Sequence, residues 1–351
     1  MGNKKVLLST ENLYVKFKVR GRELTAIRGI SLDFYEGESV AIVGESGSGK
    51  SVFTKTFSGM LEKNGYISSG AVTFFPNEPV VLSSLRKNRQ WEQIRGGQIA
   101  TIFQDPMSSL NPVLTVGKQI TSVIRKHRRC TEAQAKEQAL EMMGKVGIPD
   151  PEKRFKDYPF QYSGGMRQRI VIAIALACQP RILICDEPTT ALDVTIQAQI
   201  LQLLKDLQRE LGFTIIFITH DLGVVANIAD RVAVMYAGQV VEQGTAEEVF
   251  YDPRHPYTWA LLQSLPQLAQ KNTRLYSISG TPPSLYSNIQ GDPFAPRNPY
   301  CMRIDTLQEP PMFAITDTHF AKTWLLDPRA PQVEKPEVLQ NLHKKLGEVY
   351  G

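Results

Sequence analysis

The sequence predicts an α/β fold, in which helices cover both faces of a parallel sheet. "RILICDE" and "TIIFITH" are short, Ile-rich apolar runs that end in polar residues, and such runs are typical of strands buried in a parallel sheet. Between them lies "TIQAQILQLLKDLQREL", an amphipathic pattern at helical spacing. The resulting strand–helix–strand order is what an α/β core requires.

The size and composition of the chain narrow the choice of function. Its 351 residues allow one large or two smaller domains, and the 42% apolar content is enough for a core. The net charge of +5 is too small to indicate nucleic-acid binding, and the most basic run, 125–129, is interpreted as a solvated helix end. The longest apolar run, 170–178, is far shorter than the roughly 20 residues that span a bilayer.

The cysteines and the start of the chain suggest a compartment. Cys130, Cys178, Cys185 and Cys301 form no CxxC pair, and Cys178 and Cys185 lie in apolar runs, where cysteine behaves as a small buried hydrophobe. This usage suits a reducing cytoplasm. The first residues contain no apolar region typical of a signal peptide. We therefore expect a cytoplasmic protein that reaches a membrane only through a partner.

The first half of the chain divides into strands and a helical stretch. Residues 6–43 alternate as strands do, and another short strand is expected at 98–104. From about 105 to 172 the pattern becomes helical. Within it, Thr131 is a predicted N-cap because Gln134 follows three residues later and completes a capping box.

The helix that begins after Thr131 is expected to end at Gly147 and Pro149. Beyond about 255 the proline density rises and the periodicity fades. We place a domain boundary there.

"GESGSGKS" at 44–51 fits the P-loop pattern G-x-x-x-x-G-K-[ST] and stands between the strand "SVAIV" and a predicted helix, the context that the motif requires. Lys50 would neutralise charge on the β- and γ-phosphates, and Ser51 would ligate Mg²⁺. Val52 offers only its backbone N–H. The remaining residues expected to surround the phosphates are Gly44, Ser46, Gly47, Ser48 and Gly49.

Two acidic residues follow the apolar run "RILIC". In an α/β sheet the carboxyl end of a strand is where ligands bind, so Asp186 and Glu187 are expected beside the P-loop. Asp186 would hold Mg²⁺ through water. Glu187 would act as the general base that activates the attacking water.

"YSGGMRQR" at 162–169 places Ser-Gly-Gly at the start of a predicted helix, which is a second anion-binding pattern. One chain does not need two γ-phosphate sites for one nucleotide. The arrangement is explained if two subunits face each other and each offers this segment to the nucleotide of the other.

These motifs, in this order, resemble the ATP-binding cassette (ABC) family over roughly residues 5–255. The resemblance implies an ABC-type P-loop NTPase with a RecA-like core and a helical subdomain at about 105–172. It divides the chain into a nucleotide-binding domain at 1–255 and a proline-rich C-terminal extension at 256–351. The signature motif it implies is Ser163, Gly164 and Gly165, flanked by Tyr162 and Met166, which depart from the family's commonest Leu and Gln.

The same resemblance implies roles for four more residues. Gln104, after "TIF", is similar to the Q-loop residue that reaches Mg²⁺ and links to the membrane subunit. Asp193, in "TALD" at 190–193, would lie at the dimer seam, and His220, in "FITHDL", resembles the switch histidine near the γ-phosphate. Phe17 is the candidate for stacking on adenine.

The segments at 102–120 and 251–266 resemble the oligopeptide/dipeptide importer ATPases, most closely the D-type subunit of Gram-positive oligopeptide (Opp/Ami) importers. This implies a peripheral subunit on the cytoplasmic face of the membrane that binds and hydrolyses ATP to power oligopeptide import. The implied partners are a second ABC ATPase subunit, expected to be a paralogue, two transmembrane permease subunits and an extracellular peptide-binding lipoprotein.

Two alternatives stay open at this point. One is an importer ATPase for dipeptides, nickel or glutathione. The other, from a different class, is a soluble ABC ATPase that acts on nucleic acid or ribosomes, although a partner of that kind is not expected. Salt-sensitive nucleic-acid binding would favour the second alternative.

The extension contains "GDPFAPRNPYCMRID" at 291–305. The resemblance implies that many members of this group carry four cysteines here, which in some members hold an iron–sulfur cluster, and a [4Fe–4S] cluster normally requires four thiolates. The corresponding positions are Asp292, Asn298, Asp305 and approximately Thr323, and Cys301 falls between them. We therefore expect no iron–sulfur cluster. Pro293, Pro296 and Pro299 each favour an extended preceding residue, which predicts a stiff strap used for packing or docking.

Overall fold

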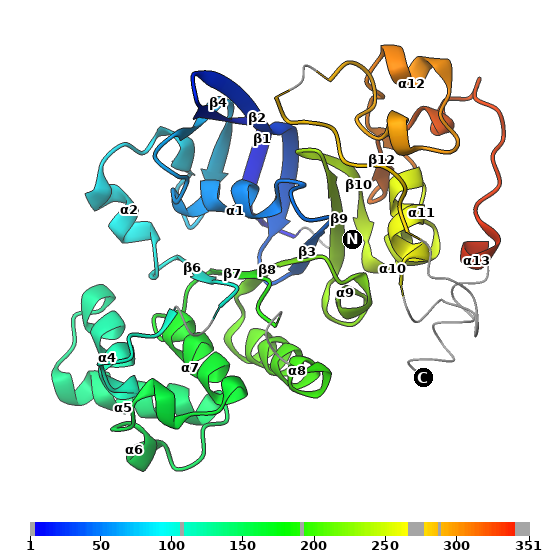
Figure 1. Cartoon of the computed structure of the whole chain (residues 1–351). Helices are drawn as coiled ribbons and strands as arrows, with labels where there is room; N and C mark the ends of the chain where they lie inside the picture. The colour runs from blue at the N-terminus through cyan, green and yellow to red at the C-terminus, as the bar shows by residue number, and fades with distance from the viewer. Residues whose placement is uncertain (1–3, 106–108, 190–192, 266–276, 287–288, 341–351) are drawn as a thin grey trace.

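A computed structural model describes the chain apart from residues 1–3, 106–108, 190–192, 266–276, 287–288 and 341–351 (Figure 1). The large sheet has the strand order β11-β12-β10-β9-β3-β8-β7-β6, and the small sheet has the order β2-β1-β4-β5. The strands of the large sheet are β3 (Ser39–Val43), β6 (Ile99–Ile102), β7 (Ile182–Asp186), β8 (Thr214–Thr219), β9 (Arg231–Tyr236), β10 (Gln239–Thr245), β11 (Phe313–Ala314) and β12 (Phe320–Ala321).

The small sheet is antiparallel and contains β1 (Val6–Val19), β2 (Arg22–Tyr35), β4 (Gly65–Phe74) and β5 (Val80–Val81). The helices of the first 230 residues are α1 (Lys50–Ser58), α2 (Asn88–Ile94), α4 (Val116–His127), α5 (Glu132–Lys145), α6 (Pro151–Arg154), α7 (Gly164–Leu176), α8 (Val194–Leu211) and α9 (Leu222–Ile228). They are followed by α10 (Ala246–Tyr251), α11 (Pro256–Gln263), α12 (Arg303–Leu307) and α13 (Glu337–Gln340).

The parallel core consists of β6, β7, β8, β3 and β9, which pair in parallel with their neighbours. Alternate residues of each strand point to opposite faces. Val40 and Ile42 pack with the small sheet and α1, whereas Ala41 and Val43 pack with α7, α8 and α9. Because both faces are buried, the strands are continuously apolar, as the sequence predicts. The predicted α/β class is confirmed.

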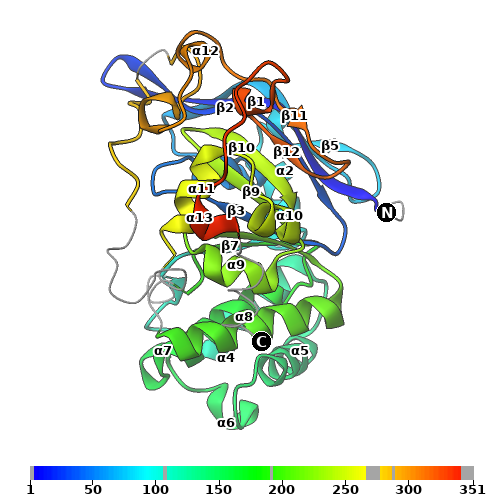
Figure 2. The same ribbon diagram turned by 90° about the vertical axis from the view of Figure 1, so that its right-hand side faces the viewer.

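The helices α4 to α7 form a group at one end of the molecule, and the small sheet lies at the other end (Figures 1 and 2). The predicted capping box of α5 is present: Gln134 N–H donates to Thr131 Oγ1 at 3.3 Å, and Thr131 N–H donates to Gln134 Oε1 at 2.9 Å. The basic run 125–129 ends α4. Cys178 and Cys185 are buried, as predicted.

Among the described helices, none has both the length and the apolar character that crossing a bilayer requires.

The C-terminal extension packs on the end of the large sheet. Its strand β12 pairs with β10 through Glu242↔Ala321 and Gln243↔Phe320. Behind this pair His319 Nε2 lies 2.8 Å from Glu242 Oε1, and both side chains are almost completely buried. In Figure 1 the later part of the extension lies above and to the right of its first helix, α11, and α11 is itself buried along most of its length.

Residues 291–305 are folded more tightly than the predicted strap. Asn298, before Pro299, is extended as expected, but Ala295, before Pro296, begins a 3-10 turn at Ala295–Arg297. The prediction of an extended residue before each proline therefore holds at Asn298 and is wrong at Ala295. The turn is stabilised by N–H donation from Ala295 to Asp292 O at 3.0 Å, and it lets the buried Phe294 ring pack against two tyrosine rings.

The four positions that would carry cluster ligands hold buried oxygen side chains. Asp292, Asn298, Asp305 and Thr323 are at most 7% exposed. Each side chain accepts a hydrogen bond from a backbone N–H close by in the sequence. For Asp292, Asn298 and Thr323 the donor is two positions later in the chain, and for Asp305 it is three positions earlier. These bonds measure 2.9 Å from Phe294 to Asp292, 2.9 Å from Tyr300 to Asn298, 2.6 Å from Met302 to Asp305 and 3.3 Å from Leu325 to Thr323. The oxygens therefore serve as local turn caps.

The ionisation of Asp292 makes the stability of this buried cluster depend on pH. Burial raises the pKa of its carboxyl to about 7, and the neighbouring Asp305 adds to the shift. The folded protein therefore keeps this proton to a higher pH than the unfolded chain does. Such a group lowers the free energy of unfolding as the pH rises from about 4 to 7.

Asp292→Asn should remove this loss of stability, because an amide does not ionise. Relative to the parent, the variant should gain about 2 kcal/mol in the free energy of unfolding between pH 5 and pH 8. Urea denaturation at four pH values would measure it. Asp327→Asn is the control, because its pair with Arg329 holds the pKa of Asp327 at about 2. A stability difference between Asp292→Asn and the parent that does not vary with pH would contradict the assignment.

Candidate nucleotide-binding site

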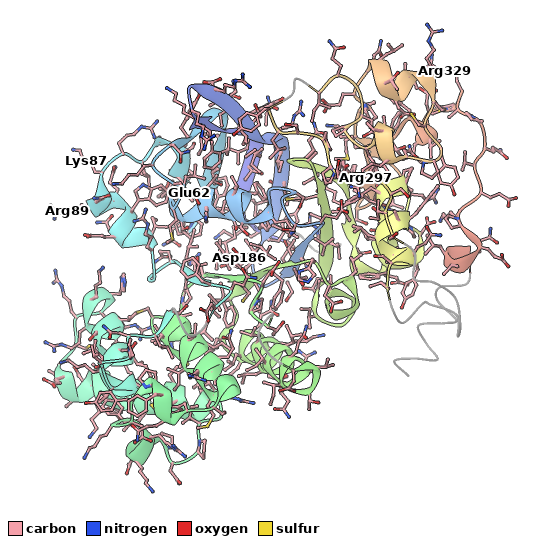
Figure 3. All side chains as sticks on the ribbon, viewed as in Figure 1. Glu62, Lys87, Arg89, Asp186, Arg297 and Arg329 are labelled. Carbon is pink, nitrogen blue, oxygen red and sulfur yellow. The ribbon has the colours of Figure 1, made fainter. Side chains whose placement is uncertain are left out.

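The predicted site residues follow four neighbouring parallel strands. The P-loop follows β3, Gln104 follows β6, Asp186 ends β7 and His220 follows β8. Because these strands are parallel, their carboxyl ends lie at one edge of the sheet, which is where α/β folds bind ligands. Figure 3 places Asp186 at this edge.

The P-loop needs glycine at two of its positions. Gly44 has φ 151°, and a Cβ there would lie 2.1 Å from Met235 O. Gly49 has φ 102° and precedes α1, which begins at Lys50. A side chain at Gly44 would push the loop away from β9, so the backbone could not keep the curvature that directs its N–H groups inward.

Lys50 spans the P-loop from within. Its Nζ donates to Gly44 O at 2.7 Å and to Glu45 O at 2.9 Å, and the residue is 6% exposed. Burial lowers the pKa of Lys50, and the carboxylates around it oppose that shift. The hydroxyl of Ser48 is buried and has no hydrogen-bond partner. A buried cation and an unpaired donor together fit a phosphate group.

Ser51 and Asp186 form the second part of the site. Ser51 Oγ donates to Asp186 Oδ1 at 3.0 Å. Burial raises the pKa of Asp186, against the effect of this hydrogen bond. A hydroxyl, a carboxylate and a nearby amide, that of Gln104, are the hard oxygen donors that Mg²⁺ takes together with phosphate oxygens.

Glu187 is held on both of its carboxylate oxygens. Gln104 Nε2 donates to Oε2 at 2.9 Å, and His220 Nδ1 lies 3.1 Å from Oε1. The backbone of Glu187 has φ 48°, a left-handed conformation that costs energy for a residue with a side chain. Its N–H donates to Ile218 O at 2.9 Å, which fixes this conformation. Three residues chosen separately from the sequence thus meet at one carboxylate.

A cleft of about 550 Å³ contains most of the predicted residues, a size that suits a nucleotide. Those that line it are Phe17, Ser46, Gly47, Gly49, Lys50, Ser51, Val52, Gln104, Asp186 and Glu187. Sequence reasoning missed five further lining residues, which are Val19, Leu24, Ala26, Glu62 and Leu285. The strand residues among them could have been found from the alternation along β1 and β2, because they share a face with Phe17, but no sequence pattern identifies Leu285.

The signature segment does not line this cleft. Ser163 is exposed and caps α7, where its Oγ accepts from Met166 N–H at 3.3 Å. Gly165 lies against Ile196, because a Cβ on it would be 2.9 Å from Ile196 Cγ2. Ser163, Gly164 and Gly165 thus form the N-terminus of α7, and this helix N-terminus lies outside the cleft of the same chain.

Asp193 caps α8 and accepts from Ile196 N–H at 3.0 Å. Ile196 therefore joins the starts of α7 and α8. The other residues of "TALD", 190–192, lie outside the described residues.

Comparison with protein families identifies two parts of the chain. Residues 27–190 match the family model described as "ABC transporter". Residues 241–304 match the model described as "Oligopeptide/dipeptide transporter, C-terminal region".

Curated relatives match along nearly the whole length. The oligopeptide transport ATP-binding protein AmiE of Streptococcus pneumoniae is 64% identical over 99% of this chain and 97% of its own. The oligopeptide transport ATP-binding protein OppD of Bacillus subtilis is 54% identical over 98% of this chain and 96% of its own. The dipeptide transport ATP-binding protein DppD of Lactococcus lactis subsp. cremoris is 52% identical over 100% and 99%.

Solved structures match the cassette. The dimeric ATP-binding cassette MJ0796 bound to ADP and Pi superposes with a TM-score of 0.60 at 29% identity, over 68% of this chain and 99% of its own. CbiO1 from Clostridium perfringens, part of the ABC transporter complex cbiONQ, has a TM-score of 0.60 at 30% identity, over 71% and 92%. With the P-loop cleft and full-length relatives in agreement, the chain belongs to the ATP-binding proteins of ABC transporters, in the branch that carries the oligopeptide/dipeptide transporter C-terminal region.

Proposed function

We propose that this chain binds and hydrolyses ATP to power the import of oligopeptides through an ABC transporter. The observation that carries the hydrolytic role is the Glu187 carboxylate, held between Gln104 and His220 beside the P-loop. The oligopeptide cargo is supported by the full-length relatives named for oligopeptide transport. The dipeptide alternative is supported by a relative of lower identity, 52%, and the nickel, glutathione and nucleic-acid alternatives have no such support.

In the proposed complex, each residue of the cleft binds a different part of ATP. Phe17 stacks on adenine, the P-loop N–H groups, including that of Val52, bind phosphate oxygens, and Lys50 neutralises phosphate charge. Ser51, Asp186 and Gln104 would hold Mg²⁺, which supplies charge neutralisation on the phosphates.

Water is the nucleophile of the proposed reaction. Glu187 accepts a proton from the water as its oxygen bonds to the γ-phosphorus. The bond from that phosphorus to the bridging oxygen breaks, so ADP and phosphate are released. His220 holds Glu187 and would lie near the γ-phosphate.

A second ABC ATPase subunit completes the proposed site. Ser163, Gly164 and Gly165 lie outside the cleft of their own chain, which supports their use on the nucleotide of a facing subunit. Asp193, at the start of α8, would lie at the seam between the subunits. A paralogue is the proposed partner.

The coupling surface is proposed to surround Gln104. Phe103 is 39% exposed and Val113 is 75% exposed on the segment that follows β6, and exposed apolar side chains of this kind support a protein partner. Two transmembrane permease subunits would dock there and hold the chain at the cytoplasmic face of the membrane. A peptide-binding lipoprotein outside the cell would supply the cargo.

The proposed division of the chain has two parts. Residues 1–255 would form the cassette, and residues 256–351 would form the C-terminal extension.

Glu187→Gln should abolish ATP turnover while ATP binding persists, because the amide keeps the shape and loses the base. The expected loss is about 10²–10⁴-fold in kcat, measured as steady-state ATPase activity of the assembled transporter. Glu141→Gln on the exposed face of α5 is the control and should retain parental activity. Parental turnover in Glu187→Gln would refute the assigned role.

Ser163→Arg should impair hydrolysis of the nucleotide held by the partner subunit and spare ATP binding by this chain. The reason is that the signature segment lies outside its own cleft. A titration of the isolated full-length chain with ATP measures the first property, and single-turnover hydrolysis in the transporter measures the second. An equal loss of affinity in the isolated chain would contradict the facing-subunit geometry.

The protein should contain no iron–sulfur cluster. The four ligand positions carry oxygen side chains that already accept backbone N–H groups, and hard oxygen donors are poor substitutes for thiolates. Anaerobic purification with iron and acid-labile sulfide analysis is the test. Stoichiometric iron and sulfide that disappear in Cys301→Ser would overturn this expectation, and otherwise Cys301→Ser should keep parental ATPase activity.

A further inference from the structure

Glu45 adds a negatively charged side chain to the loop that is proposed to surround the phosphates. Its carbonyl accepts from Lys50 Nζ at 2.9 Å and from Ser48 N–H at 3.2 Å, so its backbone is part of the P-loop. Its carboxylate also acts electrostatically on Lys50. Left without a counter-charge, Glu45 would repel the phosphates of ATP and compete with them for Lys50.

Arg297, in the C-terminal extension, supplies that counter-charge. Its Nη1 donates to Glu45 Oε2 at 2.6 Å, and its Nη2 donates to Oε1 at 3.0 Å. This is the bidentate fork that suits guanidinium and carboxylate groups. The side chain of Arg297 is 3% exposed and that of Glu45 is 28% exposed, so solvent screens the pair only partly.

The remaining donors of Arg297 are also used. Nε donates to Ser279 O at 2.9 Å, and Nη1 also reaches Tyr236 Oη at 3.2 Å. These additional hydrogen bonds hold the guanidinium in the orientation in which it binds Glu45. Figure 3 shows Arg297 beside the large sheet, whereas Arg329 points outward from the edge of the extension.

The extension holds the backbone of Glu45 as well. Glu45 N–H donates to Tyr257 Oη at 2.8 Å, and Tyr257 is completely buried on α11. Its ring packs against Tyr236 and Phe294. Both the main chain and the carboxylate of this P-loop residue are thus bound by groups that lie after residue 255.

We propose that Arg297 is a positioning residue for ATP binding, which neutralises Glu45 and so keeps Lys50 available to the phosphates. The inference rests on the proposed ATPase function and adds the C-terminal extension to the nucleotide site. A purely mechanical tie between extension and cassette would need the contact but not the charge. The two explanations therefore differ in what happens when both charges are removed together.

The test compares Arg297→Met, Glu45→Gln and the double variant in the assembled transporter, with ATPase kinetics as the readout. Arg297→Met should raise KM for ATP by roughly tenfold, because the unpaired carboxylate adds a negative charge to the loop that binds the phosphates, while kcat changes by less than about twofold. The double variant should return KM to within about threefold of the parent. Arg329→Met is the matched control, since Arg329 pairs with Asp327 on the exposed surface, and its KM should equal that of the parent.

An unchanged KM in Arg297→Met, or a double variant as impaired as Arg297→Met, would overturn the proposal. If Arg297→Met does not fold, as judged by circular dichroism, Arg297→Gln and Arg297→Lys decide, because glutamine removes the positive charge and lysine keeps it. Arg297→Gln should raise KM by roughly tenfold, whereas Arg297→Lys, which supplies one donor where arginine supplies a fork, should raise it by no more than about threefold. A parental KM in Arg297→Gln, or an equal rise of KM in both variants, would then overturn the proposal. Loss of ATPase activity in the parent would instead refute the proposed function.

Discussion

The common direction of the parallel strands is the constraint on which the site depends. Because β3, β6, β7 and β8 all run the same way, the residues that follow them meet at one edge. The P-loop, Gln104, Asp186 and His220 are far apart in the sequence, yet each needs only to follow its strand to reach the cleft. The apolar strands that enforce this arrangement are buried on both faces, so the edge is rigid.

Several charged side chains lie close together at this edge of the sheet, and each of them has a hydrogen-bonding or oppositely charged neighbour. Lys50 is buried among carboxylates whose attraction opposes the effect of burial on its pKa. Asp186 is held by Ser51, and Glu187 by Gln104 and His220. Glu45 is held by an arginine from outside the cassette. Each carboxylate has a specific partner, which leaves the interior of the P-loop suited to an anion.

The C-terminal extension folds into its own short turns and also contacts the P-loop, and its proline-rich composition indicates neither. Its proline-rich segment folds into short turns because four buried oxygens cap them. The same turns present Arg297 to the P-loop and Phe294 to Tyr236 of β9 and Tyr257 of α11. These hydrogen bonds therefore supply the local order with which the segment packs on the cassette.

The sequence by itself determined the α/β class, the strand before each motif, the capped helix at Thr131 and the residues of the P-loop, because these depend on patterns within a few neighbouring residues. It did not indicate the turn at Ala295, where packing of Phe294 outweighs the preference of a residue before proline. Nor did it indicate Leu285 in the cleft or the pair between Arg297 and Glu45, which lie 252 residues apart. Only the tertiary structure decided these contacts, since a charge pair between distant segments leaves no periodic trace in the sequence.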